Sequence, residues 1–128
     1  MLTILIADDE PHVVELVRVT LEDDRLRVVA ASDGDVALAT ADAVGPDMIF
    51  LDVNMPGPNG FEVCRRLRRD PRFSTTPIIM LTAAAQKEDI TEGAAAGADN
   101  YLTKPFSPVR LLSLVERVLP TAALWLPD

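Results

Sequence analysis

Short apolar runs alternate with amphipathic stretches along the sequence, and this alternation restricts the possible folds more than any other feature. The middle runs are almost continuously apolar, which is typical of parallel strands that helices cover on both faces. We therefore predict five strands, at Leu2–Ala7, Leu26–Ala31, Met48–Leu51, Ile78–Leu81 and Tyr101–Thr103.

The stretches between these runs repeat apolar residues at the spacing of an α-helix. Pro11 and Pro108 suit a first helical turn, and Ser107 is a good cap before Pro108. Strands that alternate with helices predict an α/β domain with a parallel sheet wound on both faces. The predicted buried stripes are Val14, Val17 and Leu21; Phe61, Cys64 and Leu67; and Leu111, Leu112, Val115, Val118 and Leu119.

The length and net charge of the chain limit the number of domains and the kinds of partner that it can bind. The 128 residues fit one domain, expected over 1–120, and leave 121–128 as an apolar tail or linker stub. Twenty acidic against twelve basic residues give a net charge of −8, which disfavours direct nucleic-acid binding. The apolar runs are too short for a membrane span, and no export leader is visible, so a cytoplasmic location is expected.

Three features have two interpretations each. The arginines between residues 65 and 72 suggest either a nucleic-acid patch or a solvated helix end, and we favour the helix end. Cys64 lies on an apolar stripe, which favours a core position over a redox sensor. His12 is the single histidine, and we expect it to be solvated instead of serving as a proton shuttle.

Polar residues follow the predicted strands. Asp8, Asp9 and Glu10 come after the first strand, and Asp52 ends the third. In a parallel sheet these ends meet at one edge, where ligands bind in such folds. The fourth strand ends in Thr82, and Lys104 follows the fifth.

This grouping of acids predicts a metal and a phosphoryl group. Two carboxylates about 4 Å apart repel by roughly 4 kcal/mol at an effective dielectric near 20. Mg²⁺ would relieve that repulsion, and Asp52 could serve as both ligand and nucleophile, with Lys104 and Thr82 on the phosphoryl oxygens. Each acid alone also fits a helix start or a turn. Turn chemistry does not explain why a lysine lies at the same edge as three aspartates, so the combination favours a phosphoryl-binding site. Since no glycine-rich phosphate loop is present, ATP is not expected as a direct ligand.

Four segments together resemble the receiver domain of bacterial two-component response regulators: ILIADDEP, IFLDVNMPGPNGFEV, PIIMLTA and GADNYLTKPF. The resemblance covers essentially residues 2–119. It implies a flavodoxin-like (βα)5 three-layer sandwich with a five-stranded parallel sheet of order 2-1-3-4-5. It also implies that a histidine kinase, or a phosphotransfer protein, phosphorylates Asp52.

The resemblance assigns further roles. Lys104 and Thr82 would contact the phosphoryl group, and Lys104–Pro105 would be a cis peptide. Thr82 and Tyr101 would form a switch that changes the face of the fourth helix, fifth strand and fifth helix. The magnesium ligands, with Mn²⁺ as a possible substitute, would be the carboxylates of Asp8, Asp9 and Asp52 and the backbone carbonyl of Asn54.

The predicted partners are a kinase, a downstream output protein or domain, and a second copy bound through that switching face. The expected function is a signalling switch that catalyses only its own phosphoryl uptake and loss. Two alternatives remain open: a magnesium-dependent phosphatase with an aspartyl intermediate, and a phosphate-independent interaction module. The phosphatase is disfavoured for two reasons. The nucleophile of such enzymes usually follows the first strand, whereas Asp52 lies on the third. Asn54 also stands where these enzymes carry a second acid.

Two further predictions concern the fourth helix and the apolar segment near the C-terminus. Gly93 interrupts a weak fourth helix, which we expect to be the mobile one. The segment around Leu124, Trp125 and Leu126 either packs on the body, docks on a partner or is a frayed linker.

Overall fold

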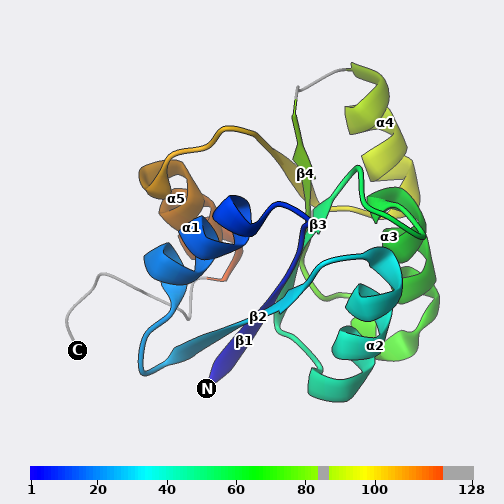
Figure 1. The fold of residues 1–128 in the computed structure, drawn as a ribbon. Helices are drawn as coiled ribbons and strands as arrows, with labels where there is room; N and C mark the ends of the chain where they lie inside the picture. The colour runs from blue at the N-terminus through cyan, green and yellow to red at the C-terminus, as the bar shows by residue number, and fades with distance from the viewer. Residues whose placement is uncertain (84–86, 120–128) are drawn as a thin grey trace.

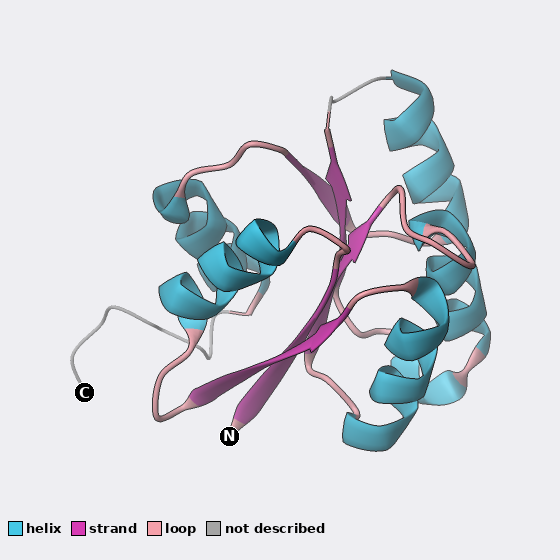
Figure 2. Cartoon of the chain, in the orientation of Figure 1, coloured by secondary structure: helices cyan, strands magenta, loops and turns pink. Residues whose placement is uncertain are grey.

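The computed structural model describes residues 1–83 and 87–119, which form a parallel sheet with helices on both faces (Figure 1). The strand order is β2-β1-β3-β4-β5, as the resemblance implies. Helices α1 and α5 cover one face, and α2, α3 and α4 cover the other (Figure 2). The elements are β1 (Leu2–Ala7), α1 (Pro11–Leu21), β2 (Leu26–Ala31), α2 (Gly34–Val44), β3 (Met48–Asp52), α3 (Gly60–Arg69), a 3-10 turn (Pro71–Phe73), β4 (Ile78–Thr82), α4 (Lys87–Ala96), β5 (Asn100–Thr103) and α5 (Pro108–Val118).

The sheet is parallel throughout, and its register aligns the strand ends. Ala7 pairs with Leu51, Asp52 with Leu81, and Thr82 with Thr103. Strands β3 and β4 are buried along their whole length, because helices cover both faces. Residues directly after β1, β3, β4 and β5 therefore emerge at the same edge.

Local sequence signals explain where the helices begin and end. The side chains of Asp33, Asn59 and Ser107 accept hydrogen bonds from backbone N–H groups in the first turns of α2, α3 and α5. Helix α2 ends at Gly45, whose φ of 58° lies in the left-handed region that glycine adopts without strain. Asn59 thus works as the cap of α3.

Two buried stripes differ from their predicted composition. In α1, Val13 is buried with Val17 and Leu21, while Val14 is only half-buried. In α5, Leu114 is buried with Leu111 and Val115, while the predicted Leu112, Val118 and Leu119 pack at the margin of the core. The spacing identified the helices correctly but not the exact direction of each stripe. Adjacent positions on a helix point about 100° apart, and the apolar spacing alone does not decide which of two neighbouring apolar residues faces the core.

Two smaller expectations concern the helices that cover the other face. Cys64 is fully buried, as predicted, with its thiol directed at the carbonyl of Ala96. Gly93 is also buried, and a Cβ at this position would lie 3.3 Å from Met80, so the glycine permits close packing of α4 on the sheet.

The predictions for 121–128, including Trp125, lie outside the described residues. Across 1–83 and 87–119, the helices are all too short or too polar to cross a membrane.

Candidate functional site

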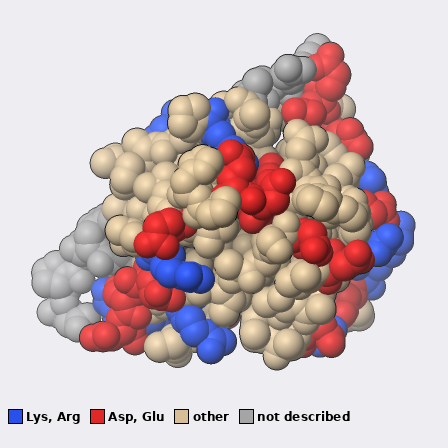
Figure 3. All heavy atoms as spheres, viewed as in Figure 1, with Lys and Arg blue, Asp and Glu red and all other residues tan. Residues whose placement is uncertain are grey.

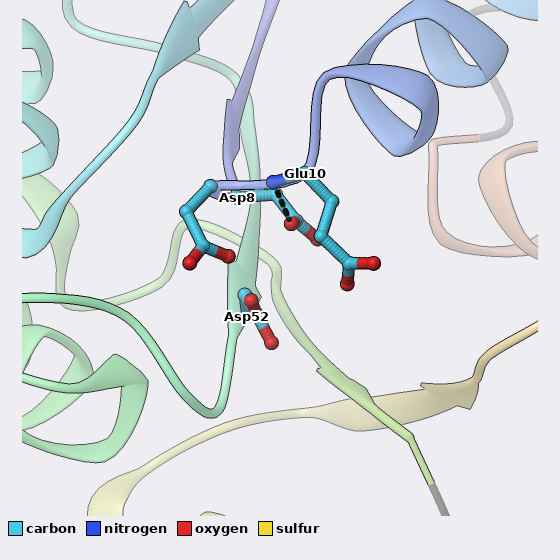
Figure 4. Close-up of side chains that lie close together, drawn as sticks. Asp8, Glu10 and Asp52 are labelled. Atoms are coloured by element: carbon cyan, nitrogen blue, oxygen red, sulfur yellow. Dashed lines mark hydrogen bonds between the residues drawn. The ribbon is translucent and has the colours of Figure 1, made fainter.

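Four acidic side chains gather at the carboxyl edge of the sheet. Asp8, Asp9 and Glu10 follow β1, and Asp52 ends β3. One carboxylate oxygen from each lies within 4.8 Å of the others. Figure 4 shows Asp8, Glu10 and Asp52 projecting into the same space. In the space-filling view, acidic atoms form a patch at the centre of the visible face (Figure 3).

Asp8 is the most deeply buried of these acids, with a side chain that is 0% exposed. Its Oδ1 accepts a hydrogen bond from the backbone N–H of Glu10 at 2.9 Å. Its Oδ2 lies 2.8 Å from the Lys104 ammonium, but out of line for a hydrogen bond, and no other donor reaches it. A buried carboxylate oxygen without a hydrogen-bond donor is costly, so Asp8 has capacity for a further cation.

Asp52 is also buried, and its Oδ1 accepts a long hydrogen bond of 3.3 Å from the backbone N–H of Asn54. Burial raises the pKa of Asp52 to about 6, the negative charge of Asp8 adds to this, and Lys104 opposes both. The loop after Asp52 turns tightly. A Cβ on Gly60 would lie 2.3 Å from the Asp52 carbonyl oxygen, so only glycine allows α3 to start this close to β3.

Lys104 is the cation among these acids. Its Nζ lies 2.7 Å from Glu10 Oε1, 2.8 Å from Asp8 Oδ2 and 3.4 Å from Asp52 Oδ1. Burial would lower the pKa of Lys104, but its contacts with Asp8, Glu10 and Asp52 outweigh this and raise it. The hydrogen bond from Lys104 lowers the pKa of Glu10. The site therefore holds a permanent positive charge that is outnumbered by carboxylates.

Lys104 owes its position to the connection after β5. Its backbone N–H donates to the carbonyl of Thr82 at 2.7 Å, which ties the connection to the end of β4. The Lys104–Pro105 peptide bond is cis.

Thr82 and Tyr101 lie on the part of the sheet that faces α4. Thr82 is buried, and its hydroxyl donates to the Asp89 carboxylate in α4 at 3.3 Å. Tyr101 is 40% exposed. A cavity of about 210 Å³ separates α4 from β4 and β5, and both residues line it together with Met80 and Ile90.

The structure brings together four of the residues that the sequence singled out, namely Asp8, Asp9, Asp52 and Lys104. Sequence reasoning missed the contact of Glu10 with Lys104, although Glu10 completes a run of three acids. His12 is exposed as expected and lies 3.5 Å from Glu10.

One part of the interpretation of the arginine cluster is wrong. Arg68 is not a solvated residue: its side chain is 16% exposed and hydrogen-bonded to three carbonyls and to Asp99. The predicted helix did not reveal this, because those partners follow α3 or lie at the far end of α4.

The comparisons with known proteins agree with this geometry. Residues 4–116 match the family described as response regulator receiver domain. The DNA-binding dual master transcriptional regulator RpaA of Synechocystis is 45% identical over 116 residues, 91% of this chain and 48% of that protein. The alkaline phosphatase synthesis transcriptional regulatory protein PhoP of Bacillus subtilis is 41% identical over 98% of this chain and 51% of its own length. The chain thus spans about half the length of these relatives.

Solved structures give the same result for the fold. The chemotaxis protein CheY4 of Vibrio cholerae superimposes with a TM-score of 0.87 at 41% identity, covering 93% of this chain and 99% of that one. The BeF3-activated DrrB receiver domain superimposes with a TM-score of 0.83 at 32% identity, covering 94% of this chain and 98% of that one. The family match, these relatives and the acidic edge of the sheet together show that the chain belongs to the receiver domains of two-component response regulators.

Proposed function

We propose that this chain accepts a phosphoryl group on Asp52 from the phosphohistidine of a sensor kinase or phosphotransfer protein, in a Mg²⁺-dependent step. The observation that carries the proposal is the placement of Asp52: a buried carboxylate 3.4 Å from Lys104 at the edge where the acids converge. Receiver domains are typically switched by phosphorylation and work with histidine kinases and output domains.

The donor set suits a hard divalent cation. The available ligands are the oxygens of Asp8, Asp9 and Asp52, with the Asn54 backbone carbonyl next along the loop, and Mg²⁺ prefers oxygen ligands. The buried Oδ2 of Asp8, which accepts no hydrogen bond, supplies a specific reason for a cation there. When bound, Mg²⁺ neutralises negative charge on the phosphoryl oxygens. Mn²⁺ has the same ligand preference and is expected to substitute.

The transfer itself needs mainly alignment and charge neutralisation. An Asp52 carboxylate oxygen attacks phosphorus, the bond between phosphorus and the donor breaks, and the electron pair leaves with the donor. Lys104 supplies a positive charge to a phosphoryl oxygen, and the Thr82 hydroxyl donates to another. Burial and the negative charge of Asp8 raise the pKa of Asp52, and a bound cation would favour the ionised, nucleophilic form.

The response of the molecule is proposed to pass through Thr82 and Tyr101. In the structure the Thr82 hydroxyl donates a hydrogen bond to Asp89 of α4. A Thr82 that turns to the phosphoryl group releases Asp89, and the cavity beside Tyr101 has room for that ring to move inward. Both changes alter the face formed by α4, β5 and α5, where a downstream partner or a second copy of the chain is proposed to bind.

Incubation with Mg²⁺ and acetyl phosphate tests the function directly. Intact-mass spectrometry should show the gain of one phosphoryl group, dependent on Mg²⁺ and lost in Asp52→Asn. The exposed Asp24→Asn variant is the matched control and should gain the group as the wild type does. A gain that survives Asp52→Asn would overturn the assignment, and steady hydrolysis of small phosphomonoesters would favour a phosphatase.

A further inference from the structure

Lys104 is shared among three carboxylates, and one of them belongs to Glu10, which has no part in the proposed transfer. An ammonium group has three N–H donors. Its distances to Glu10, Asp8 and Asp52 are 2.7, 2.8 and 3.4 Å, so the proposed phosphoryl acceptor is the most distant of the three. Only the contact with Glu10 has the geometry of a side-chain hydrogen bond.

Glu10 differs from the other two acids in its freedom to move. Its side chain is 45% exposed, against 0% for Asp8 and 7% for Asp52. Its backbone is held, because its N–H donates to Asp8 and Pro11 follows it at the start of α1. The carboxylate can therefore leave Lys104 for water while the chain around it stays in place, whereas the buried acids have no such exit.

We infer that Glu10 is a positioning residue that holds Lys104 in the unphosphorylated state and competes with the phosphoryl group for it. This inference rests on the proposed function. Lys104 must give up a carboxylate partner when phosphoryl oxygens enter the pocket, and Glu10 is the partner with access to solvent. Glu10 thereby limits how tightly the pocket holds a phosphoryl group.

The competition predicts the effect of two substitutions. Glu10→Asp keeps the charge but shortens the side chain by one methylene, and Glu10→Gln keeps the length but removes the charge. Both weaken the hold on Lys104. At saturating Mg²⁺, each should bind the phosphoryl analogue BeF3⁻ roughly two- to fivefold more tightly than the wild type, the range expected for a partly exposed ion pair. Glu15→Gln, an exposed position on α1, is the matched control and should leave the affinity unchanged.

A second readout needs neither metal nor analogue. In metal-free protein, NMR of the Lys104 ammonium should show faster exchange of its protons with water in both Glu10 variants, but not in Glu15→Gln. Mg²⁺ affinity, measured by calorimetry, separates this role from a direct role at the metal, because Glu10 lies within the acidic cluster. The proposal expects Mg²⁺ affinity to change less than BeF3⁻ affinity.

Several outcomes would overturn the inference. Unchanged BeF3⁻ affinity in both Glu10 variants shows that Glu10 does not compete. Tighter binding in Glu10→Gln alone shows a general charge effect, and an equal change in Mg²⁺ affinity shows that Glu10 acts on the metal. A wild-type protein that binds no BeF3⁻ and gains no phosphoryl group contradicts the proposed function itself, which distinguishes that failure from failure of the Glu10 inference.

Discussion

Arg68 and Lys104 lie at opposite ends of the sheet and show two ways of accommodating a partly buried cation. Arg68, in the last turn of α3, is surrounded mainly by neutral acceptors, and its guanidinium donates at 2.6 to 2.8 Å. Its acceptors are the carbonyls of Gly97, Phe73 and Thr76 and the carboxylate of Asp99. Lys104 instead faces a surplus of carboxylates.

The surroundings of the two cations indicate different roles, structural for Arg68 and functional for Lys104. At Arg68 four hydrogen bonds satisfy most of the guanidinium donors, so the network stabilises the junction of α3, the loop before β4 and the end of α4. At Lys104 the carboxylates outnumber the single cation, and the buried Oδ2 of Asp8 accepts no hydrogen bond. We therefore expect the loss of Arg68 to destabilise the fold, and the loss of a carboxylate near Lys104 to change ligand binding without destabilising the fold.

The largest effect on stability is expected for Arg68→Ala. The substitution leaves three backbone carbonyls and the Asp99 carboxylate without this donor, so the free energy of unfolding should fall by about 2–4 kcal/mol. Urea unfolding measures it. Arg69→Ala, an exposed neighbour, is the control and should change stability by less than about 0.5 kcal/mol. Equal effects of the two variants would contradict the structural role of Arg68.

At the other end of the sheet, removal of a charge should be stabilising. The folded pKa of Asp52, about 6, exceeds its usual value of 3.8, so the native state binds more protons between these values. Stability of the metal-free protein should therefore fall as pH rises from about 4 to about 6. At pH 7, Asp52→Asn should be more stable than the wild type by about 3 kcal/mol, with the difference vanishing below about pH 4. A difference that is independent of pH would contradict the pKa argument.

Mg²⁺ should stabilise the wild-type protein by a smaller amount. At a concentration ten times the dissociation constant, the expected gain is about 1.4 kcal/mol, measured by thermal or urea unfolding with and without the ion. Asp8→Asn should lose most of this gain, and Asp24→Asn should keep it. If Mg²⁺ stabilises Asp8→Asn as much as the wild type, Asp8 is not a ligand.

The smallest effect concerns motion within the folded state. Helix α4 buries only small residues, Gly93 and Ala96 among those whose burial is described, while α1 and α5 bury larger ones. We expect amide hydrogens of α4 to exchange faster than those of α1 and α5, and slowest within α4 near its C-terminal end, which Arg68 holds at Gly97. Slower exchange in α4 than in α1 and α5 would contradict this.

The sequence predicted the sheet well because burial on both faces forces its strands to be apolar throughout. Strand β1 has the predicted bounds, and β3 and β4 extend by one polar residue each, Asp52 and Thr82. Asp52 and Thr82 belong both to the strands and to the site. Apolar patterning ends each strand one residue too early, because these last residues are polar. The acids and Lys104 were predicted to converge because parallel strands end at one edge.

The contacts that were missed depend on distances that no local pattern encodes. Glu10 reaches Lys104 across 94 positions, and Arg68 reaches Asp99 across 31. Arg68 and Arg69 are neighbours of the same type, yet one is largely buried and the other exposed, because the orientation of α3 against α4 decides which side chain points inward. Such a decision requires the packed structure.

The central claim is that Asp52 is the residue that carries the phosphoryl group. Borohydride reduction converts an aspartyl phosphate to homoserine, which peptide mass spectrometry locates in the sequence. After incubation with Mg²⁺ and acetyl phosphate, the account predicts homoserine at position 52 and at no other acid. Homoserine at Asp8, Asp9 or Glu10, or none anywhere in a protein that has gained phosphoryl mass, would contradict it.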